Sequence, residues 1–224
     1  MQNIVDRLTD HLRSRLLDIA FSGDGSSYTT AERNQVLIRN NTIHEHKILR
    51  VNYTTYDIRR GADTIHTGTE RSDIMLLSHE EGEHAHPYWY ARVLAIYHVD
   101  VLLNNGKPGT FRRIDLVLVR WFGRDDPQDH GNSLLRIGWD EENEYEFLDP
   151  QHILRACQVV PAYAHGLAPV RRAIRDSRED YNYYYVMRSV FYPHFLLNLT
   201  SISAGLTATC SCGSTVVVLA TECC

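Results

Sequence analysis

The sequence predicts a mainly β fold with small peripheral helices, an α+β arrangement centred on one pair of long strands. Residues 89–103 alternate side chains over a long run, with Trp, Ala, Val and Tyr on one face, as expected for a strand. Residues 114–122 alternate in the same way, and the turn-forming run 104–109 lies between the two segments. Shorter runs rich in β-branched and aromatic residues follow, as is typical of strands.

The N-terminal residues predict an amphipathic helix over 3–20, which the turn-forming run 22–27 ends. Thr29 and Glu32 have the spacing of a capping box, which predicts one short helical turn. The apolar stripe of the first helix consists of Ile4, Leu8, Leu12, Leu16 and Ile19.

The remaining elements are predicted in chain order. Strands at 36–38 and 48–51 are expected to flank a hairpin tip at Asn40-Asn41. A turn with a short helix is expected at 149–154, and a charged helix at 169–180. One face of the long strand is expected to carry Trp89, Ala91, Val93, Ala95, Tyr97, Val99 and Val101. Other strands are expected at 74–77, 134–139, 145–148, 156–161 and 183–191.

The composition is that of a globular protein: 224 residues, 43% hydrophobic and 23% charged. A net charge of -5, from 23 basic and 28 acidic side chains, argues against a general electrostatic nucleic-acid binder. The 13 tyrosines far outnumber the 6 phenylalanines, which draws attention to aromatic surfaces. No secretory signal is visible, so we expect an intracellular location in the nucleus or cytoplasm.

The cysteines fall into two groups. Cys157 stands alone and is interpreted as a small buried thiol. The other four lie in the tail, and their spacing matches neither common zinc pattern. Residues 195–221 carry no charge, so a membrane span is an alternative, but many Ser, Thr and Gly residues make it less apolar than typical spans. We expect an irregular tail outside the fold, such as a gene-model error would produce, and no membrane association.

No catalytic residue, cofactor or metal site is predicted. The segment His79–His86 is the richest in potential metal ligands, but a solvated acidic loop is the preferred interpretation. His44 and His46 are assigned to an exposed hairpin. The chain has no Gly-x-Ser-x-Gly elbow and no phosphate-binding loop. We therefore predict a non-enzymatic protein, with a metal-dependent hydrolase at His79–His86 as a lesser alternative.

Two sets of residues are candidates for binding. Aromatic side chains can line a groove or cage a methylated ammonium, which suggests a peptide-binding surface. Clustered arginines suggest a nucleic-acid contact, although acidic neighbours at 176–180 favour a solvated helix face for part of them. The peptide-binding candidates are Tyr88, Trp89, Tyr90, Trp121 and Tyr184. The nucleic-acid candidates are Arg50, Arg59, Arg60, Arg171 and Arg172.

Six short sequence segments occur together in an order that is found in a known protein family. They are Asn52–Arg60, Asp73–Ser78, His86–Leu94, Val119–Gly123, Phe147–Pro150 and Tyr183–Val186. The set resembles the C-terminal region of Plavaka-type transposase-related proteins of mushroom-forming fungi, over residues 30 to 193. The acidic catalytic residues of longer relatives are not found in this chain, so the resemblance implies a fragment without its own strand-transfer centre.

A second resemblance is to bromo-adjacent homology domains, which are β-rich chromatin modules. It rests on Tyr90–Leu94, Val119–Phe122 and Ile153–Val159, although Arg155-Ala156 stands where that family has Gly-Lys. The resemblance implies a partly open β-barrel or sheet that binds histone tails or other proteins. Trp89, Trp121 and Tyr184 align in order with its motifs.

These observations predict three parts. Residues 1–30 form a helix and turn, 31–195 a β-rich domain, and 196–224 an uncharged tail. The function predicted first is a protein- or peptide-interaction module, with a histone tail as one possible partner. The alternative is a nucleic-acid-contacting accessory region of a transposase, with DNA as a weak partner. The sequence predicts no particular oligomeric state.

Overall fold

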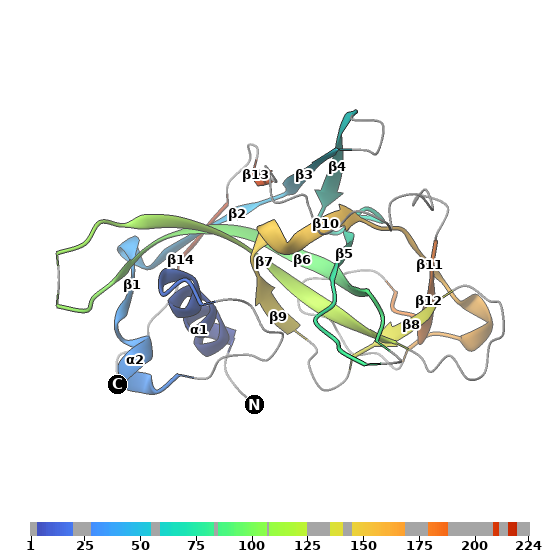
Figure 1. Ribbon diagram of the computed structural model, residues 1–224, viewed down its shortest axis with the longest axis horizontal. Coiled ribbons are helices and arrows are strands. Elements are labelled where there is room, and N and C mark those ends of the chain that lie inside the picture. Colours follow the sequence, from blue (N-terminus) through green and yellow to red (C-terminus); the bar gives the residue numbers. More distant parts are fainter. Residues whose placement is uncertain are drawn as a thin grey trace.

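The computed structural model of the chain describes most of its first 187 residues and two short segments of the tail (Figure 1). The described ranges are 4–19, 28–54, 59–82, 85–106, 108–124, 135–140, 145–168, 179–187, 208–210 and 215–218.

The fold is mainly β with peripheral helices, as predicted, and its centre is the hairpin of β6 (Tyr88–Leu103) and β7 (Arg112–Arg124). Strand β6 pairs along its other edge with β5 (Asp73–Leu77), then β2 (Thr42–His46), then β1 (Val36–Ile38). Strand β7 pairs with β8 (Arg136–Trp139) and β9 (Tyr145–Leu148). The result is a curled, partly open sheet built along one long hairpin (Figure 1).

The sheet continues beyond this hairpin in the order β10-β5-β6-β7-β8-β12-β11. A second sheet has the order β13-β3-β4. The remaining strands are β3 (Ile48–Thr54), β4 (Arg60–His66), β10 (Ile153–Ala156), β11 (Val159–Pro161), β12 (Tyr183–Val186), β13 (Ala208–Cys210) and β14 (Thr215–Val218). The helices are α1 (Ile4–Leu16) and α2 (Thr30–Arg33), with 3-10 turns at Arg39–Asn41, Pro150–His152 and Tyr163–His165.

A bulge in β6 divides its inward side chains between two faces, so the single face predicted for Trp89 to Val101 is wrong. Val93 pairs with Val119 and Ala95 with Leu118, which leaves Leu94 as an extra residue. Because side chains alternate along a strand, the extra residue reverses the pattern beyond it. Ala91 and Val93 therefore join one core cluster, whereas Ala95, Tyr97, Val99 and Val101 face another.

Asn40 and Asn41 do not form a hairpin tip. Strands β1 and β2 both pair with β6 rather than with each other, and a 3-10 turn connects them. Both asparagines have positive φ, 54° and 50°, a conformation that asparagine tolerates better than most residues. Strand β2, which the sequence analysis did not predict, carries two histidines next to the centre of the sheet.

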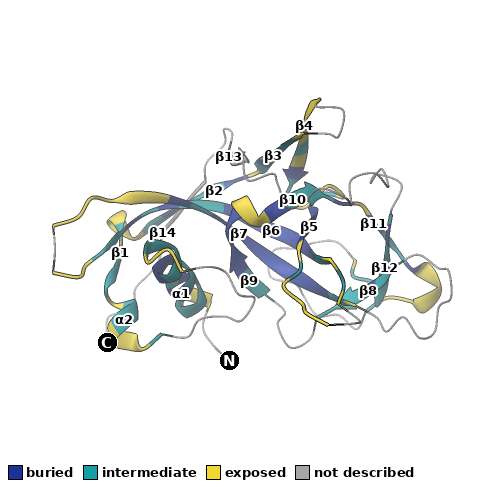
Figure 2. Ribbon diagram, in the orientation of Figure 1, coloured by how far each residue is buried: buried dark blue, intermediate teal, exposed yellow. Residues whose placement is uncertain are grey.

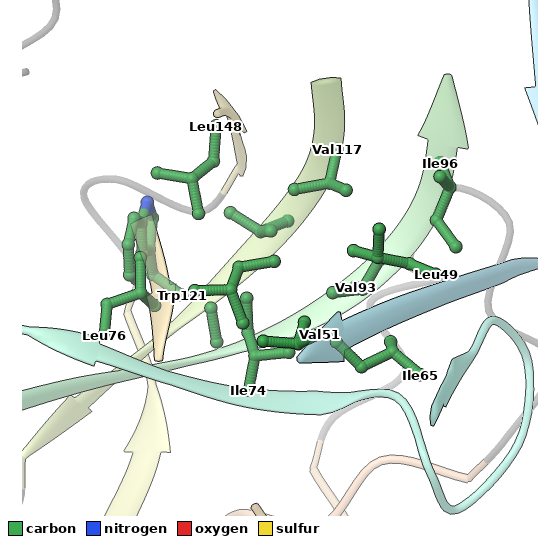
Figure 3. Close-up of a cluster of buried hydrophobic side chains, with 13 residues drawn as sticks. Leu49, Val51, Ile65, Ile74, Leu76, Val93, Ile96, Val117, Trp121 and Leu148 are labelled. Carbon is green, nitrogen blue, oxygen red and sulfur yellow. The ribbon is translucent and has the colours of Figure 1, made fainter. Parts of the chain in front are cut away.

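The cores lie on opposite sides of the hairpin. One cluster fills the space between the hairpin and the β3–β4 sheet, with Trp121 at one end (Figure 3). A second cluster lies under α1, on the other side of the hairpin (Figure 1). Buried residues accordingly line the middle of β6 and β7, and the exposed ones concentrate at the ends of the sheet (Figure 2).

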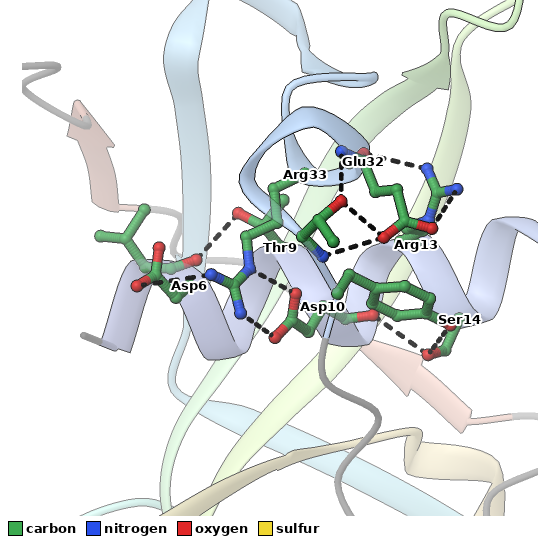
Figure 4. A network of polar contacts seen from close by, with 10 residues as sticks. Asp6, Thr9, Asp10, Arg13, Ser14, Glu32 and Arg33 are labelled. Atoms are coloured by element: carbon green, nitrogen blue, oxygen red, sulfur yellow. Dashed lines mark hydrogen bonds and ion pairs between the residues drawn. The ribbon is translucent and has the colours of Figure 1, made fainter. Parts of the chain in front are cut away.

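Helix α1 is fixed by both apolar and polar contacts. Leu8 and Leu12 are 3% and 0% exposed in the second cluster, and burying each side chain contributes roughly 1.5–3 kcal/mol. Arg33 of α2 donates to both carboxylate oxygens of Asp10, at 2.6 and 2.7 Å (Figure 4). The predicted capping box between Thr29 and Glu32 is present. Residues of α2 thereby anchor the helix that covers the second core.

The other secondary-structure predictions differ from the structure in smaller ways. The expected strand at 156–161 is two strands, because Cys157 and Gln158 separate β10 from β11. The expected strand at 183–191 is described over Tyr183–Val186, and residues 188–191 lie outside the described ranges. Most of the expected helix at 169–180 also lies outside them. Cys157 is buried, as predicted, and burial raises the pKa of its thiol.

The tail is not irregular where it is described. Strand β14 pairs with β2, with Val216 opposite His44, and β13 pairs with β3. The β-branched side chains of Thr215–Val218 favour this extended conformation. The prediction of a tail outside the fold is therefore wrong for these two segments. Within the described residues, no helix combines the length and the apolar character needed to cross a bilayer.

Candidate functional site

The five aromatic peptide-binding candidates do not meet in one groove. Tyr90, Trp121 and Tyr184 are 5%, 8% and 2% exposed, and Tyr88 and Trp89 are half-buried. Trp89 and Trp121 contact each other edge to face, with ring centroids 6.0 Å apart, in the first core cluster. Tyr88, Tyr90 and Tyr184 belong to a separate cluster. Tyr88 and Tyr90 face away from Trp89 because neighbouring residues of a strand point to opposite sides.

Carboxylates hold both indole rings. Trp89 Nε1 donates to Glu80 Oε1 and Trp121 Nε1 donates to Glu146 Oε2, each at 2.8 Å. Glu80 also accepts a hydrogen bond from Arg124, so the residues before β6 are joined to the end of β7. Burial raises the pKa of Glu146. The two tryptophans are therefore fixed structural residues with their polar atoms already satisfied.

The structure contains an aromatic cage, but its cations are two arginines of the chain itself. The guanidinium carbon of Arg92 lies 5.0 to 5.5 Å from the ring centroids of Phe122, Trp139 and Tyr184. That of Arg120 lies 3.8 Å from the centroid of Trp139. The arginine side chains are 5% and 2% exposed. We call these residues, with Asp73 and Asp180, the arginine box.

Two carboxylates compensate the buried positive charges. Arg92 Nε lies 2.7 Å from Asp73 Oδ1, and a second guanidinium nitrogen lies 3.3 Å from Asp73 Oδ2. Asp180 accepts a 2.6 Å hydrogen bond from Arg120 and lies 3.7 Å from Arg92. Burial lowers the pKa of Arg92, but Asp73 and the Tyr184 hydroxyl outweigh it, so the net pKa is raised. Arg92 therefore stays charged inside the protein.

Tyr163, which is exposed, and Tyr181, which is half-buried, form a second aromatic pair near this cage. Their rings are nearly perpendicular, at 82°, with centroids 5.1 Å apart. Tyr163 is 68% exposed, and Leu167, paired with Tyr181 through an isolated bridge, is 54% exposed. The exposed turn that carries Tyr163 follows β11, the last strand of the described sheet path (Figure 2). Gly166, at φ 73°, allows this turn to fold back on Asn182.

Most other exposed or half-exposed rings already carry a cation of this chain. Arg136 lies 4.8 Å from the centroid of Tyr183, Arg39 lies 4.6 Å from Phe111, and Arg155 lies 3.5 Å from Tyr53. In the part of the chain that the structure describes, no cation lies over Tyr163 or Tyr181. Glu179 is close enough to contribute to a raised pKa of Tyr181, for which burial is the larger cause. The pair thus offers aromatic surface and a neighbouring negative charge.

The sequence analysis predicted a strand at 183–191 and a binding role for Tyr184, but it did not single out Tyr163 or Tyr181. For β12 the alternation of side chains does indicate orientation: since Tyr184 is buried, Tyr183 and Tyr185 face the other side of the strand. Tyr163 had no comparable signal, because it lies in a 3-10 turn that a long-range contact with residues 180–182 holds in place.

The nucleic-acid candidates that the structure describes lie on or beside the β3–β4 sheet. Arg50, Arg59 and Arg60 are exposed. Arg50 pairs with Thr64 and Arg60 pairs with Thr54, which places both arginines on the outward face of that sheet. Arg171 and Arg172 lie outside the described residues.

The histidine-rich segment forms no metal centre among the residues that the structure describes, where no group of three His, Cys, Asp or Glu is placed to hold a metal ion. His79 packs its ring 5.4 Å from that of Trp89, and His86 Nδ1 contacts the backbone of Tyr88. His84 lies outside the described ranges.

Comparison of the chain with family models, with curated proteins and with solved structures finds no match.

We expect the arginine box to stabilise the fold strongly. Asp73→Asn removes the principal counter-charge of a buried arginine, which should lower the free energy of unfolding by about 3 kcal/mol. Urea unfolding followed by tryptophan fluorescence measures this loss. The matched control is Asp100→Asn, because Asp100 pairs with the exposed Arg39 and should cost less than about 1 kcal/mol. Equal losses in the two variants would contradict the interpretation.

Proposed function

We propose that this chain is a non-enzymatic interaction module that binds a peptide through a lysine or methylated lysine side chain. The observation that carries the proposal is the perpendicular pair of exposed Tyr163 and half-buried Tyr181, with no cation of the described residues above it. Aromatic faces attract ammonium groups, and Glu179 adds charge complementarity. A positively charged partner also suits the net charge of -5.

The rest of the chain supports this choice of ligand. Its own arginines lie over aromatic rings at several places, which supports cation–aromatic contact as a preferred interaction of its surface. Leu167 lies next to the pair and provides apolar area for methyl groups or for the lysine stem. Strand β11 ends the described sheet path beside Tyr163, so an extended peptide has backbone to lie against.

The resemblances noted above supply a biological context for the proposal. A module similar to bromo-adjacent homology domains would find such a ligand in a histone tail. A relative of Plavaka-type transposase-related proteins would find it in the nucleus. Of the peptide-binding residues proposed from the sequence, Tyr184 takes a supporting role here, because it accepts a hydrogen bond from the backbone N–H of Tyr181.

Binding should depend on the charge of one peptide side chain. We expect full-length protein to bind peptides of a histone-tail array that contain lysine or trimethyl-lysine more tightly than the same peptides with norleucine. Tyr163→Ala should weaken binding up to about fivefold, because one exposed cation–aromatic contact contributes about 0.5–1 kcal/mol. Fluorescence anisotropy with the labelled peptides gives the affinities.

Phe111→Ala is the matched control, because Phe111 is a 38% exposed ring at the opposite end of the sheet, beside the tip of the β6–β7 hairpin. It should leave the affinity unchanged. Equal binding of norleucine peptides, or no binding to any peptide of the array, would reject the proposal.

A second candidate function is a nucleic-acid contact on the outward face of the β3–β4 sheet. It is favoured by the shared orientation of Arg50 and Arg60 on that exposed face. Thr and Asn side chains between them, including Thr64 and Asn52, can also bind phosphate oxygens.

If this surface binds DNA, the affinity should fall steeply with salt, and replacing both Arg50 and Arg60 by Ala should make that dependence shallower by about two phosphate contacts. A mobility-shift titration at several salt concentrations measures the slope. Replacing Arg39 and Arg112, which lie near the hairpin tip, provides the control. Salt-independent binding, or equal slopes for both double variants, would argue against this surface.

A further inference from the structure

Three histidines from two adjacent strands form a compact stack. Strand β2 places His44 and His46 on one face, and His98 of β6 lies directly opposite His44. The His98 ring stacks on His44 with centroids 4.5 Å apart, and on His46 with centroids 4.8 Å apart. His46 Nε2 and His98 Nδ1 are 2.5 Å apart and share a hydrogen bond. We call these three residues the histidine stack.

The stack is built for neutral rings. A hydrogen bond between two imidazole nitrogens needs one protonated and one unprotonated nitrogen. A further proton removes the acceptor or adds a positive charge, and a charge on His98 would lie within 5 Å of two other imidazoles. His46 is 5% exposed, and its Nδ1 has no hydrogen-bond partner among the described residues, so water has little access to a charge formed there.

The groups around the stack reinforce this preference. Arg113 of β7 lowers the pKa of both His46 and His98, and Asp115, opposite His98, acts in the other direction. Arg113 donates to Asp115, which limits that compensation. On the far side of β2, strand β14 contains no titratable residue. Burial is the largest cause of both shifts, and the pKa of His98 is lowered to about 4.

Other charges on the same two strands are engaged elsewhere. Asp100 of β6 accepts a hydrogen bond from Arg39, at 3.1 Å. Glu45 lies between the two histidines of β2, so its side chain faces the opposite side, where it pairs in register with Tyr97. Asp115 is thus the principal carboxylate facing the stack from the neighbouring strand.

We propose that the histidine stack is an acid-sensitive clasp, which holds β2 on β6 at neutral pH and releases β2 when the stack takes up protons. The register of β2 with β6 covers His44 to His46 alone, so residues of the stack hold two of the three paired positions of β2. Strand β14 pairs with β2 and would be released with it. The clasp concerns the edge of the sheet far from Tyr163, so it is independent of the proposed peptide site.

The sign of the pH dependence follows from the lowered pKa. When β2 leaves, His98 of β6 loses the cover and the two imidazoles of β2, and its pKa rises from about 4 toward the ordinary value near 6.5. The released state therefore takes up protons first, and the clasped state loses stability as the pH falls from about 6.5 to about 4. Between pH 7 and pH 5 the opening equilibrium should rise by up to about 20-fold for His98 alone, with solvent screening reducing this figure.

Hydrogen exchange of the full chain at pH 7 and pH 5 tests the clasp. After correction for intrinsic exchange rates, the amides of β2 should lose protection at pH 5, while those of β5 keep theirs. His98→Gln retains a hydrogen-bonding side chain without a titrating group, so it should remove most of the pH dependence in β2. His66→Gln is the control, because His66 lies at the end of β4, outside the stack, and this variant should behave like the parent.

His44→Gln is a second variant, on the partly exposed side of the stack, in case His98→Gln does not fold. It should reduce the pH dependence of β2 without removing it. The proposal is overturned if β2 and β5 lose protection in parallel in the parent protein. It is equally overturned if the folded stack variants show the same pH dependence as His66→Gln.

Discussion

Two buried arginines face each other across the central hairpin, and the rest of the fold is arranged around the need to stabilise them. Arg92 and Arg120 occupy directly opposite positions of β6 and β7, where like charges repel. Asp73 neutralises Arg92 from β5, and Asp180 reaches both arginines from the residues before β12. These contacts select which strands lie beside the hairpin, because a buried charge without its partner is costly.

The same requirement explains where the aromatic residues lie. Phe122, Trp139 and Tyr184 surround Arg92 with their ring faces, so they stabilise an internal cation. They also contribute to the core cluster that contains Tyr90. Tyr184 also accepts a hydrogen bond from Tyr181 N–H, which links the buried cage to the pair Tyr163 and Tyr181. The pair Tyr163 and Tyr181 places aromatic rings at the surface, whereas the rings of the arginine box surround a cation of the chain itself. This is the physical basis for proposing a cationic peptide as the ligand.

Local patterns predicted the parts of the fold that depend on local interactions. The alternation of β7, the turn before it and the capping box at Thr29 are all encoded within a few residues. The bulge at Leu94 was not predictable in this way, because it shows only as a shift between paired strands. The prediction of a hairpin tip at Asn40-Asn41 was wrong for a related reason. Strands β1 and β2 each pair with β6, and this pairing outweighed the local turn preference.

The candidate sites depended even more on long-range contacts. An arginine in an alternating strand is normally assigned to a solvated face, yet Arg120 is buried against a carboxylate 60 positions away. Trp89 and Trp121 were predicted as peptide-binding residues, and the contacts that bury or half-bury them, with Glu80 and Glu146, lie 9 and 25 positions away. The histidine stack joins His46 to a residue 52 positions later, and no local motif marks it.

The central claim is that Asp180 and the two arginines act as one unit, and a double-mutant cycle on Arg120→Met and Asp180→Asn tests it most directly. Free energies of unfolding are needed for the parent, the two single variants and the double variant. A shared buried ion network predicts that the double variant loses less stability than the sum of the single losses, by more than about 1 kcal/mol. Losses that add within about 0.5 kcal/mol would contradict the account.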